Sequence, residues 1–258
     1  MLVMKIINKE GKVKKEASGE DEVKIAYRGE YCSEDQISLM SSIYPQLVEI
    51  CLDSCLHPCI VWLTKEVKFC IPENLERKRY QEQSFKGVRH LGSARICNFK
   101  ELKNYRNLAL NTHDFIDNDA IFPHASSNVE TDNPQFYACN VINGTFSTVN
   151  HGSWPHGSWG INKQNDAYLK IDFKRIVTID KIKLYLRADF PHDSYWQQCS
   201  LTFSNGDTME LSLHKTGLAQ MFQFSEKKIE WIILENLVKS NDESQYPALS
   251  QIEVWGKG

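Results

Sequence analysis

Short runs in which apolar and polar residues alternate recur along the whole chain, and they limit the fold most. Residues 22–27 (EVKIAY) place an apolar side chain at every second position, the spacing of a strand with one buried face. Asn205 and Gly206 separate two such runs and suit the positive φ angles of a type I′ hairpin turn. No strand–helix–strand alternation is visible, so the sequence predicts an all-β protein with antiparallel sheets.

The strand patterns form two groups, which predicts two domains. The chain has 258 residues, 41% of them hydrophobic, enough for two cores. Residues 98–107 (NFKELKNYRN) have the apolar spacing of a short amphipathic helix. We expect an N-terminal β-sandwich over residues 1–105, a second β-sandwich over residues 106–258 and a short linking helix.

Charge and hydropathy exclude two classes of partner. The formal net charge is −3 and is spread without a basic stripe, which argues against nucleic acid. No apolar run approaches the roughly 18 residues that suggest a membrane-spanning helix. The N-terminal residues lack the pattern of a secretory signal, which predicts a cytoplasmic location.

The eight cysteines are concentrated early in the chain, and Cys51, Cys55 and Cys59 are spaced four residues apart. The paired C-x-x-C spacing of common zinc sites is missing. We interpret these residues as reduced, small apolar side chains of the core, with a metal site or a disulfide cluster as the alternative.

Several segments of the C-terminal part resemble, in the same order, a known family. They are residues 107–110 (NLAL) with 125–127 (ASS), 138–144 (ACNVING) with Thr148, 168–173 (YLKIDF) and 250–256 (SQIEVWG). They are similar to discoidin (coagulation factor type C) domains and to galactose-binding-like carbohydrate-binding modules. The resemblance implies a galactose-binding-like jelly roll. The N-terminal part resembles a β-sandwich of uncharacterised bacterial proteins, which implies no function.

The same resemblance implies a loop that can hold a structural calcium ion through two carboxylates. In this chain the two positions are Asn143 and Gln251, with Thr148 nearby in the motif. A hard cation such as calcium takes much of its affinity from charged ligands. The loop of Asn143, Thr148 and Gln251 is therefore a weak candidate ion site; calcium is possible but disfavoured, and no cofactor is expected.

Two segments supply the side chains that sugar recognition requires, a flat apolar platform and groups that hydrogen-bond hydroxyls. They are residues 151–160 (HGSWPHGSWG) and 187–196 (RADFPHDSYW). We expect Trp154 or Trp196 to be the platform and Arg187 to bind neighbouring hydroxyls. The remaining candidate ligand-binding residues are His156, Trp159, Asp189, His192, Asp193 and Tyr246.

Structural explanations compete with these assignments. Trp159 directly precedes a strand pattern, and Trp231 and Trp255 lie within strand patterns, which suits core residues. Arg187 and Asp189 suit an internal salt bridge. A zinc site at the histidines is disfavoured because no further ligand has a convincing spacing.

The sequence therefore predicts a non-catalytic, lectin-like carbohydrate-binding protein. One alternative is a glycoside-processing enzyme that uses Asp189, Asp193 and His192 for acid–base chemistry. A second is a protein assembly module, since Trp, Tyr and Arg also dominate protein interfaces. The expected partners are a carbohydrate ligand and, in the alternative, a protein partner or a second copy of the chain.

Overall fold

The structure is a computed structural model that describes residues 1–149, 154–188 and 194–258. The chain divides into two compact units. Unit 1 contains residues 1–101 and 118–122, and unit 2 contains residues 102–117 and 123–258. No helix among the described residues is both long and apolar enough to cross a membrane.

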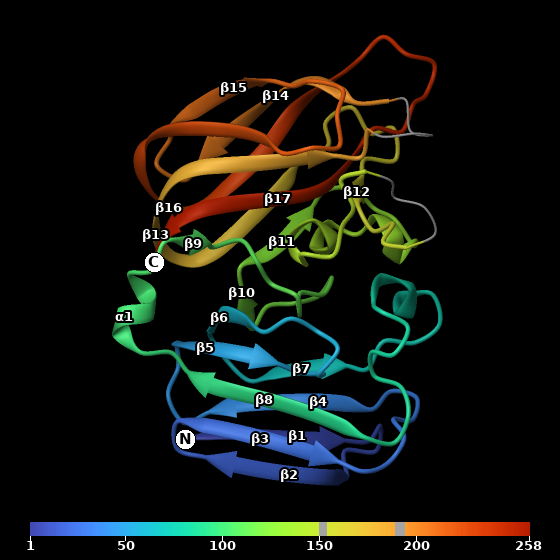
Figure 1. The fold of residues 1–258 in the computed structure, drawn as a ribbon, viewed down its shortest axis with the longest axis vertical. Helices are drawn as coiled ribbons and strands as arrows, with labels where there is room; N and C mark the ends of the chain where they lie inside the picture. Colours follow the sequence, from blue (N-terminus) through green and yellow to red (C-terminus); the bar gives the residue numbers. More distant parts are fainter. Residues whose placement is uncertain (150–153, 189–193) are drawn as a thin grey trace. The chain divides into compact units, whose positions relative to one another are not determined.

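Unit 1 consists of two antiparallel sheets (Figure 1). One sheet has the order β2-β1-β4-β7 and the other β10-β6-β5-β8-β3. Alternate residues of β1, namely Leu2, Met4 and Ile6, are buried, as the period of two predicts. The strands are β1 (Leu2–Ile7), β2 (Val13–Gly19), β3 (Glu22–Tyr27), β4 (Gln36–Ser41), β5 (Gln46–Cys51), β6 (Cys59–Leu63), β7 (Val67–Cys70), β8 (His90–Ile96) and β10 (Ile121–Phe122), with a 3-10 turn, η1 (Glu76–Arg79).

A buried ion pair lies beside the first sheet of unit 1. The Asp35 side chain is fully buried, and its Oδ2 accepts hydrogen bonds from Lys14 Nζ at 2.5 Å and from the Cys32 backbone N–H at 2.8 Å. A buried carboxylate is costly unless a charged partner and donors compensate it. Lys14 and the Cys32 N–H therefore compensate the burial of the Asp35 side chain inside unit 1.

Unit 2 is built on two long strands that belong to both layers of a β-sandwich. Residues 169–172 of β13 pair with β11 on one side and with β16 on the other, whereas residues 178–186 of β13 pair with β17. Lys174, between these parts, has φ of 55°, and the pairing register shifts there. The elements are β9 (Arg106–Asn107), β11 (His124–Ser127), η2 (Pro134–Phe136), η3 (Ala138–Ile142), β12 (Trp159–Gly160), β13 (Leu169–Leu186), β14 (Trp196–Phe203), β15 (Thr208–Ser212), β16 (Gln220–Lys239) and β17 (Ala248–Lys257).

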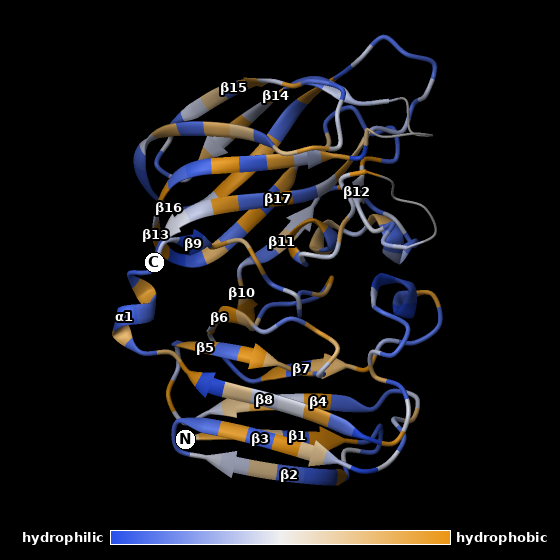
Figure 2. Cartoon of the chain, viewed as in Figure 1, coloured by the Kyte–Doolittle hydropathy of each residue, from blue (hydrophilic) through white to orange (hydrophobic). Residues whose placement is uncertain are grey.

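Hydropathy alternates along β16 and β17, as the short orange and blue segments of Figure 2 show. The apolar side chains of the two layers meet in one core. Its members include Ile171, Phe173, Leu184, Phe203 and Val254. The predicted all-β class with antiparallel sheets is confirmed.

Gly256 in the C-terminal motif permits a close approach of two backbones. A Cβ at this position would lie 2.1 Å from the carbonyl oxygen of Thr178 and 2.8 Å from Ile179 Cα. Ile179 is also the partner of Gly256 in the β13–β17 ladder. The glycine that ends the IEVWG motif is thus explained by packing of β17 on β13.

The link between the units differs from the prediction. Helix α1 spans only Phe99–Leu102, because Asn98 Oδ1 caps its start and residues 106 and 107 pair with β17 instead. Residues 118–122, which the sequence places in the second domain, belong to unit 1, where β10 pairs with β6.

The cysteines are only partly core residues. Cys59, Cys139 and Cys199 are buried, but Cys32 and Cys70 are exposed. For these last two residues the core interpretation is wrong, since they lie in a loop and at the end of β7.

Candidate functional site

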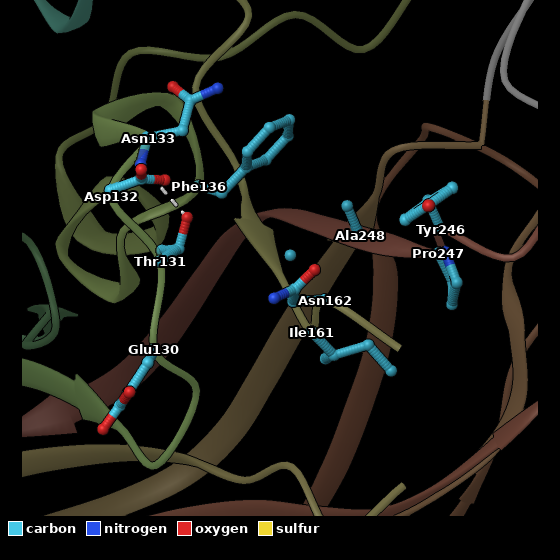
Figure 3. A pocket seen from close by; sticks show the side chains of 11 residues that line it. Glu130, Thr131, Asp132, Asn133, Phe136, Ile161, Asn162, Tyr246, Pro247 and Ala248 are labelled. Carbon is cyan, nitrogen blue, oxygen red and sulfur yellow. Dashed lines mark hydrogen bonds between the residues drawn. The ribbon is translucent and has the colours of Figure 1, made fainter. Parts of the chain in front are cut away.

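Unit 2 contains a cleft of about 680 Å³, within the size range of small-molecule sites. Figure 3 shows Phe136 on one side of the cleft, Tyr246 and Pro247 on the other, and Asn162 between them. Aromatic, amide, hydroxyl and carboxylate groups thus share one hollow. The lining residues are Glu130, Thr131, Asp132, Asn133, Phe136, Gly160, Ile161, Asn162, Tyr246, Pro247 and Ala248.

The short strand β12 positions the middle of the cleft. Trp159 pairs with Leu249 and Gly160 pairs with Ala248, so the strand is fixed to the start of β17. A Cβ on Gly160 would lie 3.2 Å from Cδ1 of Phe136. The Phe136 ring therefore rests against the glycine, which leaves room for it beside the cleft.

A capped 3-10 turn positions the wall that carries Phe136. Asn133 Oδ1 accepts a hydrogen bond from the Gln135 N–H at 3.1 Å, and Thr131 Oγ1 accepts one from the Asn133 N–H at 3.2 Å. Pro134 at the first position suits such a turn because it has no N–H to satisfy. These bonds make the Phe136 wall locally ordered.

A tight turn after β12 presents Asn162. The Gln164 N–H donates to the Ile161 carbonyl at 2.8 Å, and the two central residues, Asn162 and Lys163, have φ of 45° and 63°. Two consecutive positive φ values define a type I′ turn. Asn tolerates this left-handed conformation well, whereas Lys does so only at a cost.

Tyr246 forms the opposite wall and touches the same turn. Its side chain is 55% exposed, and the Lys163 ammonium lies 4.9 Å from the centre of its ring. The loop before it is held by Lys239 Nζ, which donates to the carbonyls of Ser240 at 2.7 Å and Asp242 at 2.8 Å. Tyr246, a candidate from the sequence, is therefore placed in the cleft.

Arg187 and His156, two further candidates, belong to a hydrogen-bond network that reaches Gln135, next to the cleft residue Phe136. Arg187 Nη1 donates to the His156 carbonyl and to Ser158 Oγ, each at 3.2 Å. The Nε2 of His156 contacts the amide of Gln135, and the Ser158 N–H donates to the Gln135 carbonyl at 2.9 Å. The contacts of these two side chains connect β13 to the turn that carries Phe136.

The tryptophan candidates lie in very different environments. Trp196 is 1% exposed and its ring lies 5.8 Å from that of Trp159, which is also 1% exposed. The prediction that Trp196 provides a platform is wrong, because a ring enclosed by the core cannot stack on a sugar. Trp159 is also a core residue, which was the structural alternative suggested by the sequence. Its Nε1 donates a hydrogen bond to Ser127 Oγ at 3.1 Å. Trp154 is 45% exposed but does not line the cleft.

Asp189, His192 and Asp193 lie outside the described residues, as does His151. The acid–base alternative built on the first three therefore stays a prediction.

A smaller cavity of about 260 Å³ shares the lining residues Glu130, Thr131 and Phe136 with the cleft.

Trp231 and Trp255 were expected in the core and are instead half-buried on polar faces of the sheets. Lys181 and Lys183 lie 4.8 Å and 4.9 Å from the Trp255 ring, and Lys170 lies 5.6 Å from the Trp231 ring. The core interpretation is wrong because both residues occupy the solvent-facing phase of the strand alternation.

The loop resembling an ion site is organised by its own amides. Gln251 is buried, and its Oε1 accepts a hydrogen bond from the Gly144 N–H at 3.3 Å. Asn143 Oδ1 accepts one from the Thr145 N–H at 2.7 Å. Across the part of the chain that the structure describes, no group of three His, Cys, Asp or Glu side chains is arranged to hold a metal ion.

The sequence did not point to Phe136, on one side of the cleft, or to Asn162, between its two sides. Asn162 had a detectable signal, since Asn-Lys between two strand patterns suggests a tight turn. Phe136 had none, because its exposure depends on Gly160, a residue 24 positions later in the chain.

No family model matches the chain, and no curated protein matches it. Similar solved structures include chitosan-binding module 1 of a chitosanase/glucanase from Paenibacillus sp. IK-5, which is 17% identical, has a TM-score of 0.40, and covers 58% of this chain and 98% of its own. The lectin domain of lectinolysin, complexed with Lewis B antigen, is 16% identical with a TM-score of 0.44, covering 59% of this chain and 97% of its own.

The family 32 carbohydrate-binding module of C. perfringens NanJ, in complex with galactose, is 14% identical with a TM-score of 0.38, covering 51% of this chain and 91% of its own. At such low identities and TM-scores, the ligands of these proteins do not identify a ligand of this chain. By their descriptions, these similar structures are carbohydrate-binding modules and a lectin domain.

Proposed function

We propose that the cleft of unit 2 binds a glycan without catalysing a reaction on it. The observation that carries the proposal is the arrangement of Phe136, Asn162 and Tyr246 around one hollow of about 680 Å³. The resemblance of the surrounding motifs to carbohydrate-binding modules supports the same proposal. The binding site itself is inferred from these side chains.

The chemistry of the three side chains fits a sugar ring. Sugars present an apolar C–H face and an edge of hydroxyls, so their sites combine an aromatic surface with hydrogen-bonding groups. Phe136 and Tyr246 offer two aromatic surfaces. The Asn162 amide, which can both donate and accept, lies between them.

Further polar groups at the Phe136 wall would set the choice among sugars. Asp132 is exposed at the cleft, and a carboxylate accepts hydrogen bonds from hydroxyls strongly. A shallow polar ligand buries little apolar area, so binding of a single sugar would be weak, with a dissociation constant on the order of 0.1–1 mM.

A glycan array followed by calorimetry on the strongest neutral oligosaccharide tests the proposal. We expect Phe136→Ala to weaken binding by about 2- to 12-fold, because it removes a stacking interaction worth roughly 0.5–1.5 kcal/mol. Trp154→Ala is the matched control: it removes an exposed aromatic residue that does not line the cleft and should leave affinity unchanged.

The two variants distinguish the competing sites. Loss of binding in Trp154→Ala but not in Phe136→Ala would move the site to the loop predicted from the sequence. Absence of binding by the wild-type protein across neutral and acidic glycans would refute the proposal. Circular dichroism of each variant shows that the fold is retained.

A further inference from the structure

The type I′ turn at the cleft contains a residue that its backbone conformation does not favour. Such turns prefer glycine at the second central position, but here Lys163 holds φ of 63°. Residues kept in disfavoured conformations often serve a site. A contact made by the Lys163 side chain would explain why a residue other than glycine occupies this position.

The Lys163 side chain contacts the wall of the cleft. Its ammonium lies 4.9 Å from the centre of the Tyr246 ring, within the distance of a cation–π interaction. Asn162, the preceding residue, lines the cleft. One turn thus presents a polar group to the cleft and a cation to the ring of the opposite wall.

The Tyr246 side chain lies largely outside the packed core. It is 55% exposed and follows the loop of residues 240–245, which contains no helix or strand. An exposed ring on a loop samples several orientations, and a ligand binds more weakly when the competent orientation is only partly populated. An attached cation would raise that population.

We propose that Lys163 is a positioning residue that holds the Tyr246 ring in its orientation for glycan binding. The inference rests on the proposed function of the cleft. The positive φ of Lys163 aims its side chain across the turn toward the ring, while Asn162 faces the cleft. Glycine would fit the turn best, but it has no side chain to reach Tyr246. This explains why a lysine occupies the position despite the cost of the left-handed conformation.

Substitutions that separate charge from shape test this role. Lys163→Met keeps the aliphatic stem and removes the charge, and we expect it to weaken binding of a neutral array oligosaccharide by about 2- to 5-fold. Lys163→Arg keeps the cation and should bind within about 2-fold of the wild type. Both keep a non-glycine residue in the turn, so the backbone preference changes little.

A readout without glycan separates this inference from the proposed function. The ring current of Tyr246 should shift the Lys163 methylene protons upfield in NMR spectra, and Tyr246→Leu should abolish that shift. If the shift is present and the wild type binds no glycan, the proposed function fails and the positioning role fails with it. If the wild type binds and Lys163→Met binds equally well, only the positioning role is refuted.

The double variant tests whether the ammonium acts through the ring. In a Tyr246→Leu background, Lys163→Met should cause no further loss of affinity, because the ring it positions is gone. An equal further loss in that background would show that Lys163 contacts the glycan directly and would overturn the positioning role. An unshifted Lys163 resonance in the wild type would overturn it as well.

Discussion

Substitution of Gly160 by alanine should weaken glycan binding while leaving the fold stable. The added Cβ would lie 3.2 Å from Cδ1, 3.5 Å from Cγ and 3.6 Å from Cβ of Phe136. The first of these is tighter than most real contacts, so Phe136 must move by a few tenths of an ångström. The ring can give way because its other side borders the cleft, and it would move into the space a sugar needs.

The size of the effect follows from the contact that is disturbed. Loss of aromatic stacking, roughly 0.5–1.5 kcal/mol, corresponds to about 2- to 12-fold in affinity. Stability should change little, since the small strain is offset by the roughly 0.4–1 kcal/mol gained when alanine replaces glycine in a compatible conformation. The melting temperature should stay within about 3 °C of the wild type.

Gly256→Ala is the contrasting control in the same sheet. There the added Cβ would meet the Thr178 backbone oxygen at 2.1 Å, and a backbone atom within a ladder cannot rotate away. Overpacking of this kind costs about 1–3 kcal/mol or more, a fall in melting temperature of about 2–12 °C for a unit of this size.

Calorimetric titration with the array oligosaccharide and differential scanning calorimetry measure both quantities. We expect lower affinity at unchanged stability for Gly160→Ala. Unchanged affinity would mean that Phe136 does not border the bound glycan. A loss of stability as large as that of Gly256→Ala would mean that the Phe136 ring has no room to move.

Other perturbations test the ion pairs and the cleft. Burial alone would lower the pKa of His124, but the charge of Asp114 and a 2.8 Å hydrogen bond to it raise that pKa above the usual 6.5. The pair therefore stabilises unit 2 fully below pH ~6.5 and loses this contribution as the pH rises through the raised value. Denaturant unfolding from pH 6 to 9 should show that decline, and His124→Gln should remove it. Lys14→Met should destabilise unit 1 by about 3 kcal/mol because it leaves the carboxylate of Asp35 buried without its cation; denaturant unfolding measures the change, and an unaltered midpoint would contradict it. Asn162→Ala should weaken glycan binding about 3-fold or more in calorimetry through the lost amide, and unchanged affinity would exclude Asn162 from the site.

The strands were predictable because their information is local. The alternation in residues 22–27 and the Asn205–Gly206 pair each act within a few residues, and the structure has a strand and a hairpin there. The predicted type I′ turn is wrong, because Gly206 has a positive φ of 90° but Asn205 does not. The motif glycine, Gly256, was recognisable as part of a pattern. Its physical reason, contact with Thr178, became visible only when β13 and β17 were placed side by side.

The cleft was less predictable because exposure is a property of packing. Trp154 and Trp196 occur in similar aromatic-rich segments, yet one is 45% exposed and the other 1%. Arg187 has the chemistry of a ligand-binding residue, but it does not line the cleft, and its Nη1 donates to the His156 carbonyl and to Ser158 Oγ. Tyr246, predicted as a ligand-binding residue, lines the cleft, and its loop, bounded by Pro and Ser, has no strand pattern to bury it.

Because residues 118–122 belong to unit 1, a single cleavage of the chain cannot separate the two units completely. The chain leaves unit 2 after residue 117, contributes β10 to the edge of β6 in unit 1, and returns at residue 123. Cleavage near residue 105 would remove β10 from unit 1 and leave β6 as an open edge, the kind of surface that promotes aggregation. It would also leave Ile121 and Phe122, which are 0% and 6% exposed, on a fragment without their strand partner. Unit 2 therefore cannot be moved between proteins as one uninterrupted segment without either the partner strand of residues 118–122 or a replacement for these residues.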